Sequence, residues 1–287
     1  MKCIKAMMWA AMMAVLGCGG SGDPFEEGEE KLGESAEEAL VSPWGRTITA
    51  EVVALDQMYV YDRLGTHNPA GMIYALKRDV VAADPSLPLG PGNAMLRPGK
   101  RPRPLVLRVN VNDKLVISFT NWLRPASGPL PLRSPTTRHA SIHVAGLQIR
   151  DIGALGGDVG QNPSSLAAPG ETRTYELYAD REGSFLMHSA GAMVGADAPG
   201  APVRQVAQAL FGVVTVEPAG SVAYRSQVTA EDLAAASLDP PNPDGTPRID
   251  YDAIGPDGQP ILRMTSDAGE IVHGDLNAII VGYDETE

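Results

Sequence analysis

Short segments of alternating apolar and polar residues constrain the fold of this chain more than any other feature. One face of residues 170–180 is apolar, which is the period-two pattern of a half-buried strand. Gly183 interrupts the pattern, residues 184–188 begin a second strand, and residues 211–216 form a third. The pattern therefore predicts successive short strands in this part of the chain, not helices.

The same alternation appears earlier in the sequence. Residues 47–55 form the first expected strand, with residues 58–61 as a possible continuation. Residues 105–121 alternate on both sides of the turn sequence Asn112-Asp113-Lys114. This arrangement predicts a β-hairpin.

Composition agrees with an all-β fold. The chain has 31 glycines and 24 prolines among 287 residues, and only 5% of its residues are aromatic. Many short strands with frequent turn residues favour a β-sandwich, and this length suffices for one sizeable core. Residues 84–104 and 151–169 are the longest expected loops.

Two segments carry histidines next to expected strands. Residues 141–146 read Ser-Ile-His-Val-Ala-Gly, and residues 183–190 read Gly-Ser-Phe-Leu-Met-His-Ser-Ala. Together with Ala-Leu-Phe-Gly at 209–212, they resemble, in this order, the N-terminal cupredoxin (plastocyanin-like) domain of the multicopper oxidase family. The resemblance covers residues 47–218. It implies an all-β, cupredoxin-like Greek-key β-sandwich with long loops and a short C-terminal extension.

The loop of residues 151–169 is similar to that of the very large bacterial multicopper oxidases. In that branch the N-terminal domain often lacks the copper-binding histidines. In the present chain Ala145 and Ala190 stand where the family has the second histidine of each pair. The resemblance thus implies that only half of each pair is kept.

His143 and His188 are the metal-ligand candidates that the resemblance implies. His139 lies four residues before His143, and such positions share one face of a strand, so we expect it to be a third candidate. Met187 and Met193 are candidate thioether ligands, a type suited to Cu(I). The expected cofactor is therefore one weakly bound copper ion.

Larger copper centres do not fit this sequence. A type 1 site requires a thiolate, whereas the only cysteines are Cys3 and Cys18 in the first twenty residues. A trinuclear cluster requires paired histidines from two domains. The chain has five histidines, so a redox reaction would need a partner cupredoxin domain or oxidase subunit. No other catalytic motif is present, and enzymatic activity stays an open question.

The first 42 residues read as an export and anchoring region. Lys2 and Lys5 precede an apolar run that is too short to span a bilayer, and the run ends in Val-Leu-Gly-Cys18. This pattern predicts a lipoprotein signal peptide over residues 1–18, with lipidation at Cys18. Residues 19–42 are rich in glutamate and predict a disordered acidic tether. We expect an exported cell-envelope lipoprotein that meets the membrane through its lipid anchor only.

Residues 43–220 are the expected cupredoxin-like domain. Residues 221–287 are either a loop-rich extension or the start of a second cupredoxin domain. In this part Thr229 is the expected N-cap of a short helix, and residues 261–264 and 278–281 are a possible hairpin.

The formal net charge is −12, and an acidic surface without a basic cluster argues against nucleic acid as a partner. Two functions remain open. One is an exported multicopper-oxidase-like protein with weak, mononuclear copper binding and a redox role only with a partner domain. The other is a copper-free structural or protein-binding β-sandwich module at the cell envelope.

Overall fold

The computed structural model describes residues 45–125, 137–191 and 204–282. The expected signal peptide, Cys18, the acidic tether and Met193 lie outside these residues. Within the part that is described, no helix is long and apolar enough to cross a membrane.

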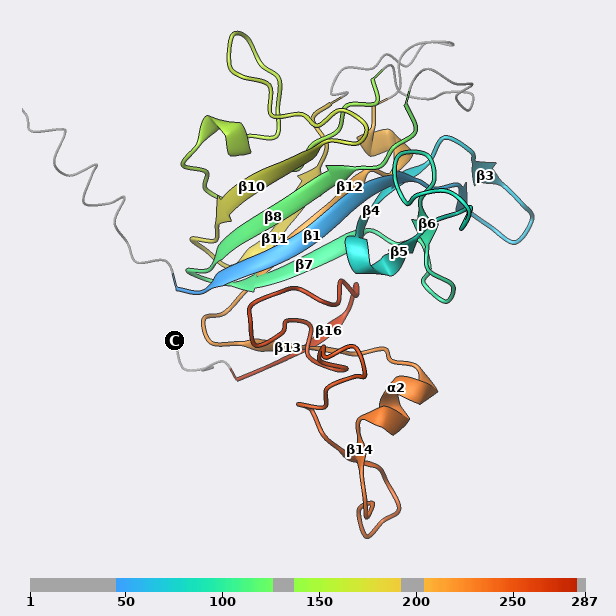
Figure 1. The fold of residues 1–287 in the computed structure, drawn as a ribbon. Helices are drawn as coiled ribbons and strands as arrows, with labels where there is room; N and C mark the ends of the chain where they lie inside the picture. Colours follow the sequence, from blue (N-terminus) through green and yellow to red (C-terminus); the bar gives the residue numbers. More distant parts are fainter. Residues whose placement is uncertain (1–44, 126–136, 192–203, 283–287) are drawn as a thin grey trace, which may run out of the picture. The chain divides into compact units, whose positions relative to one another are not determined.

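Two four-stranded sheets face each other and form the sandwich (Figure 1). The first has the order β10-β8-β1-β4, with strands β1 (Thr47–Asp56), β4 (Met72–Leu76), β8 (Lys114–Asn121) and β10 (Thr172–Tyr178). The second has the order β7-β12-β11-β9, with strands β7 (Leu105–Asn110), β9 (His143–Val144), β11 (Gly183–His188) and β12 (Phe211–Glu217).

The strands pair in a mixed, Greek-key pattern. Strands β1 and β8 are parallel, as are β7 and β12, while the other pairs within these two sheets are antiparallel. Consecutive strands are therefore often not neighbours. The described residues form the cupredoxin-like β-sandwich that the sequence predicts.

The prediction of a β-hairpin over residues 105–121 is wrong. Strand β7 belongs to the second sheet and β8 to the first, so the turn between them carries the chain from one sheet to the other. Asn112 takes a left-handed φ of 69° at this corner, and the Asp113 carboxylate accepts hydrogen bonds from the backbone of Asn110 and from Arg46. Both strands point apolar residues at a shared core, so alternation alone cannot distinguish a hairpin from a corner.

The core lies between the sheets. Phe119 is fully buried, and its ring contacts the rings of Tyr74 and Tyr175, with centroids 6.0 and 6.2 Å apart. The hydroxyl of Tyr74 donates to the carbonyl of Ser141, and that of Tyr175 donates to the carbonyl of Ser165. Burial raises the pKa of both tyrosines, so both hydroxyls keep their protons as donors.

Short two-stranded pieces cover the end of the first sheet. Strand β1 ends at Asp56, so residues 59–60 do not extend it and pair with residues 67–68 instead. A small second core joins Leu55, Ile73 and Trp122 to this region. The short strands and turns of this region are β2 (Tyr59–Val60), β3 (His67–Asn68), η1 (Lys77–Asp79), β5 (Val80–Val81) and β6 (Met95–Leu96).

The C-terminal extension has little regular structure. Thr229 caps the short helix α2 as expected, through a capping box with Asp232. The possible hairpin of residues 261–264 with 278–281 does not form, because residues 278–281 pair with β13 instead. The elements after the sandwich are β13 (Val222–Arg225), α2 (Ala230–Ala235), β14 (Ser237–Leu238), β15 (Arg248–Ile249) and β16 (Ala278–Val281).

The extension packs against the sandwich. Ile271 lies in the main core, and the backbone of Thr49 in β1 bonds with Gly269 and Ile271. Arg108 of β7 donates a side-chain hydrogen bond to the carbonyl of Leu276. Part of the outer side of β7 is thereby covered.

Asn121 supplies a test of this packing. Its side chain is fully buried, donates to the carbonyls of Arg138 and Ala167, and accepts from the backbone of Leu123. We expect Asn121→Ala to lower the free energy of unfolding by about 3 kcal/mol, because it leaves buried backbone groups without partners. Urea denaturation measures this loss.

The matched control is Asn162→Ala, since Asn162 is exposed. Its effect should stay within about 0.5 kcal/mol, as for ordinary surface substitutions. Equal losses in the two variants would contradict the assigned role of Asn121.

Candidate metal centre

Two short antiparallel strands bring the two main candidate histidines together. His143 of β9 and His188 of β11 are directly opposite each other in the register. Their ring centroids are 5.2 Å apart and their planes are inclined by 60°. Two neighbouring strands therefore hold the two rings close together.

Both imidazoles point away from the core. The flanking residues Val144 and Met187 are buried in the main hydrophobic cluster, and side chains alternate between the faces of a strand. His143 and His188 consequently lie on the outer face of the second sheet, where both are partly exposed. Ligands approaching from outside the sandwich can reach them.

Met187 is not placed to join this pair. Its side chain is 0% exposed and lies against Gly212 within the core, on the face opposite to His188. The thioether expectation for Met187 therefore fails on geometry, because neighbouring residues of a strand point in opposite directions. Met193, the other thioether candidate, lies outside the described residues.

Hydrogen bonds fix the tautomer of each ring. The Nδ1 of His143 is 2.7 Å from the carbonyl oxygen of Leu155, and the Nδ1 of His188 is 3.2 Å from that of Ser189. A carbonyl only accepts, so each Nδ1 carries the proton in the neutral ring. Each Nε2 then carries the lone pair that a metal ion requires.

Gly156 allows the loop of residues 152–157 to approach β9. Its φ is +73°, and a Cβ at this position would lie 2.1 Å from the carbonyl oxygen of Ile142. Only glycine fits such a close, left-handed position without strain. This approach brings the carbonyl of Leu155 to the His143 ring.

Two serines hold the histidine-bearing segments together. The backbone N–H of Ser141 donates to the hydroxyl of Ser189, and the backbone N–H of Ala190 donates to the hydroxyl of Ser141. Both serines are at most 1% exposed. The reciprocal contact aligns β9 with the end of β11 and so keeps the two rings opposite each other.

The other histidines lie elsewhere. Strand β9 contains only two residues, so His139 falls outside it and is exposed, with its ring against Thr137. His67 is exposed in β3, and His273 is part of the C-terminal extension. The structure therefore brings together His143 and His188 and does not place His139 on a shared strand face with His143.

The two imidazoles by themselves are an incomplete ligand set for a copper ion. Within residues 45–125, 137–191 and 204–282, no group of three or more histidine, cysteine or acidic side chains is arranged to hold a metal ion. Two imidazoles with free Nε2 atoms suit a single copper ion and leave coordination positions open. A multinuclear centre would need ligands that these residues do not supply.

The sequence motifs identified the two histidines but not what orients them. Ser141 and Ser189 flank the histidines in those motifs, and their positions gave no hint of a reciprocal contact between segments. The Leu155 carbonyl lies 12 residues beyond His143 in a loop. Contacts of this type depend on backbone conformation and leave no pattern of side chains in the sequence. The one sequence signal for the close approach of this loop is the glycine pair Gly156-Gly157.

No protein-family model and no curated protein sequence matches this chain. Among solved structures, it is similar to a copper nitrite reductase from Nitrosomonas europaea, with 18% identity and a TM-score of 0.35 over 61% of this chain and 42% of that one. It is also similar to a multicopper oxidase from Pseudomonas thermotolerans, with 21% identity and a TM-score of 0.34 over 60% of this chain and 30% of that one. A further multicopper oxidase has 22% identity and a TM-score of 0.35, over 61% of this chain and 44% of that one. The chain thus spans less than half of each of these proteins.

The tautomer of His143 can be tested directly. We expect nitrogen chemical shifts of the neutral ring to show the proton on Nδ1, because the Leu155 carbonyl accepts a hydrogen bond there. His139 is the comparison ring, because its Nδ1 faces the Thr137 hydroxyl, which can donate or accept and so imposes no tautomer. A proton on Nε2 of His143 would remove the lone pair assigned to the metal and contradict this geometry.

Proposed function

We propose that this chain is an exported, cupredoxin-like domain protein of multicopper-oxidase lineage that binds one copper ion weakly through His143 and His188. The observation that supports the proposal is the cross-strand histidine pair, with rings 5.2 Å apart. Both Nδ1 atoms contact carbonyls, which leaves both Nε2 atoms for the ion. Bound copper would supply a redox-active centre.

A partner would have to complete this centre. Two imidazoles are too few ligands for a tight, closed site, so the affinity of the chain alone is low. The pair lies on an outer sheet face beside Phe211 and Val213 of β12, which are only partly buried. A partner cupredoxin domain or oxidase subunit that docks on this face supplies the remaining ligands, and a redox role depends on that partner.

The lineage proposal rests on the order of the motifs. Ala145 and Ala190 occupy the positions at which the family resemblance implies histidines, two residues after His143 and His188. Both alanines are at least partly exposed, so larger side chains have room there. The chain then represents a domain in which each of the two copper-binding histidine pairs is reduced to a single histidine.

A copper-free binding module is the second candidate. Leu186 is 47% exposed on the same outer face as His188, two residues away on β11. Its cross-strand neighbour is Val213. An apolar strip of this type serves a protein partner whether or not a metal is bound.

Copper titration of the purified domain separates the two candidates. We expect one ion per chain, measured by competition with a chromophoric chelator, and at least tenfold weaker binding in His143→Ala and in His188→Ala. The reason is that each variant removes one of only two ligands. His67→Ala is the control and should bind as the unmodified protein does, because His67 is exposed in a separate strand pair.

The double variant Ala145→His and Ala190→His extends this experiment. It rebuilds both expected pairs and should raise copper affinity above that of the unmodified protein. Failure of this variant to bind copper would overturn the motif assignment and favour the copper-free module. More than one copper per unmodified chain would overturn the proposed mononuclear site.

The cellular location is a separate proposal. We propose that Cys18 is lipidated and anchors the protein at the cell envelope, on the evidence of the charged start, the apolar run and the glycine before the cysteine. Cys18→Ser should move the full-length protein from the membrane fraction to the soluble fraction. Cys3→Ser is the control, and unchanged fractionation of Cys18→Ser would refute the anchor.

A further inference from the structure

A cleft between the sandwich and the C-terminal extension is a feature that the proposed function does not use. Its volume is about 910 Å³, which is at the upper end of the range of small-molecule sites, roughly 300–1,000 Å³. The first sheet contributes the end of β4 and the following turn, and the extension contributes the segments around α2 and His273. The cleft is therefore built by segments far apart in the sequence.

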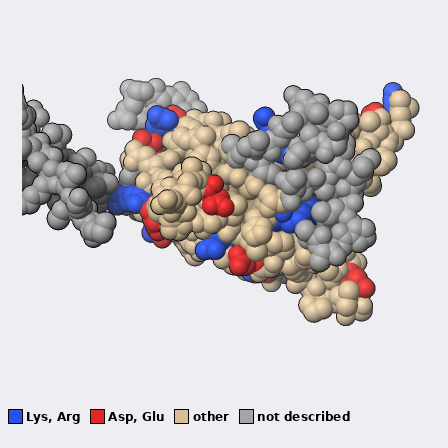
Figure 2. All heavy atoms as spheres, turned by 90° about the horizontal axis from the view of Figure 1, so that it is seen from above, with Lys and Arg blue, Asp and Glu red and all other residues tan. Residues whose placement is uncertain are grey.

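Basic side chains dominate the charge of this cleft. Six basic residues line it against four aspartates, although the whole chain carries a formal net charge of −12. On the face drawn in Figure 2, by contrast, basic and acidic side chains lie in small scattered groups. The six basic residues are Arg78, Arg97, Lys100, Arg101, Arg103 and Arg225.

Four of these residues come from one short segment. Residues 97–103 read Arg-Pro-Gly-Lys-Arg-Pro-Arg, so the expectation that the chain has no basic cluster is wrong for this segment. The segment lies at the end of a proline-rich loop, and prolines predict turns whatever the charge of the residues between them. All four of its basic side chains line the cleft.

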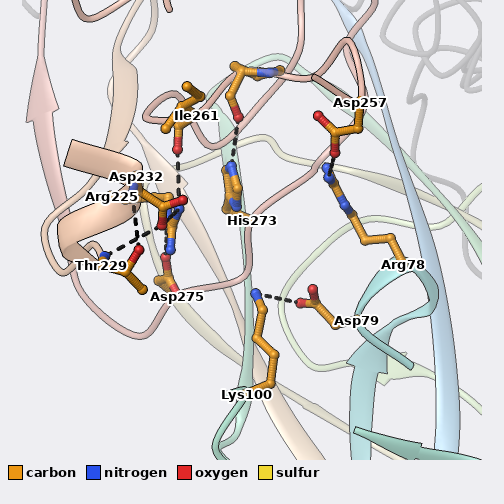
Figure 3. A network of polar contacts seen from close by, with 11 residues as sticks. Arg78, Asp79, Lys100, Arg225, Thr229, Asp232, Asp257, Ile261, His273 and Asp275 are labelled. Carbon is orange, nitrogen blue, oxygen red and sulfur yellow. Dashed lines mark hydrogen bonds and ion pairs between the residues drawn. The ribbon is translucent and has the colours of Figure 1, made fainter. Parts of the chain in front are cut away.

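The aspartates neutralise only the inner basic residues. Arg78 pairs with Asp257 at 2.6 Å, Lys100 with Asp79 at 3.0 Å, and Arg225 with both Asp232 and Asp275 (Figure 3). These pairs account for all four aspartates of the lining. Among the described residues, Arg101 and Arg103 have no hydrogen bond or ion pair, and both side chains are exposed.

His273 is a partly buried residue of the cleft lining. Its Nε2 lies 2.8 Å from the carbonyl oxygen of Pro260, and Figure 3 shows the ring between Arg225 and Arg78. Burial, together with the nearby charges of Arg225, Arg78 and Lys100, lowers the pKa of His273 to about 4. The ring is therefore neutral near pH 7, chiefly because burial disfavours its charged form.

We propose that this cleft binds a small organic anion with two or more carboxylate or phosphate groups, held by Arg101 and Arg103. Guanidinium groups bind carboxylates and phosphates through paired N–H donors, and two such groups lack any acidic partner here. The apolar wall, which includes Leu96, Ile261 and Val272, accommodates the carbon skeleton of the ligand. The site is independent of the histidine pair.

Isothermal titration calorimetry with citrate tests the proposal, with pyrophosphate as a second probe. We expect saturable binding at low ionic strength and at least tenfold weaker binding in the Arg101→Ala, Arg103→Ala double variant. Arg63→Ala and the His143→Ala, His188→Ala variant should each bind within twofold of the unmodified protein. Arg63 is exposed and lies outside the cleft, and within the described part of the chain it has no hydrogen bond or ion pair. The histidine variant excludes binding through copper.

Which of the two probes binds more tightly identifies the group that the cleft prefers. Ring signals of His273 should shift during the titration, while those of exposed His67 should not. Arg101 and Arg103 are exposed and without partners, so their removal should leave the melting temperature unchanged, which shows that lost binding is not lost folding. The proposal is overturned if neither probe binds at concentrations up to about 10 mM. It is also overturned if Arg63→Ala weakens binding as much as the double variant.

Discussion

The contact of Phe119 with two buried tyrosines is the interaction on which the arrangement of the candidate site depends. Phe119 belongs to β8, and the rings of Tyr74 and Tyr175 approach it from β4 and β10 of the same sheet. Each aromatic contact contributes about 1 kcal/mol beyond the area that it buries. The tyrosine hydroxyls then reach across to the carbonyls of Ser141 and Ser165. Aromatic side chains of the first sheet thus hold the segment that leads into β9 of the second sheet.

This link explains how a strand of two residues positions a histidine. Strand β9 has too few backbone hydrogen bonds to be stable by itself. The preceding segment is fixed by Tyr74 through the Ser141 carbonyl, by Ser189 through the Ser141 backbone, and by Asn121 through the Arg138 carbonyl. His143 is therefore oriented by buried polar contacts on its neighbours, and its own side chain remains available on the surface.

The sequence predicted those parts of the fold that depend on a local pattern. Alternation located β1, β10, β11 and β12, and Thr229 as an N-cap located α2, because each signal lies within a few residues. It did not predict that β7 and β8 belong to different sheets, since their partners β12 and β1 are distant in the chain. The two histidines followed from motif order. Gly156, the serine pair and the grouping of Arg101 with Arg225 required the tertiary fold.

The outer face of the second sheet has different surroundings over β7 than over β11 and β9, and this difference affects both proposed sites. Over β7 the extension covers the sheet: Val106 is 3% exposed, and Asn110 donates a hydrogen bond to the carbonyl of Ser221. Over β11 and β9 the outer face carries Leu186, 47% exposed, beside the histidine pair. Removal of apolar area from water stabilises the fold, so contact with the covered half holds the extension in place. The extension in turn forms one wall of the basic cleft. In the other half, the apolar side chain of Leu186 stays in contact with water beside the two imidazoles. A partner that docks there would bury this apolar area and could supply the missing metal ligands in the same step. The proposed function therefore couples docking of a partner to completion of the metal site.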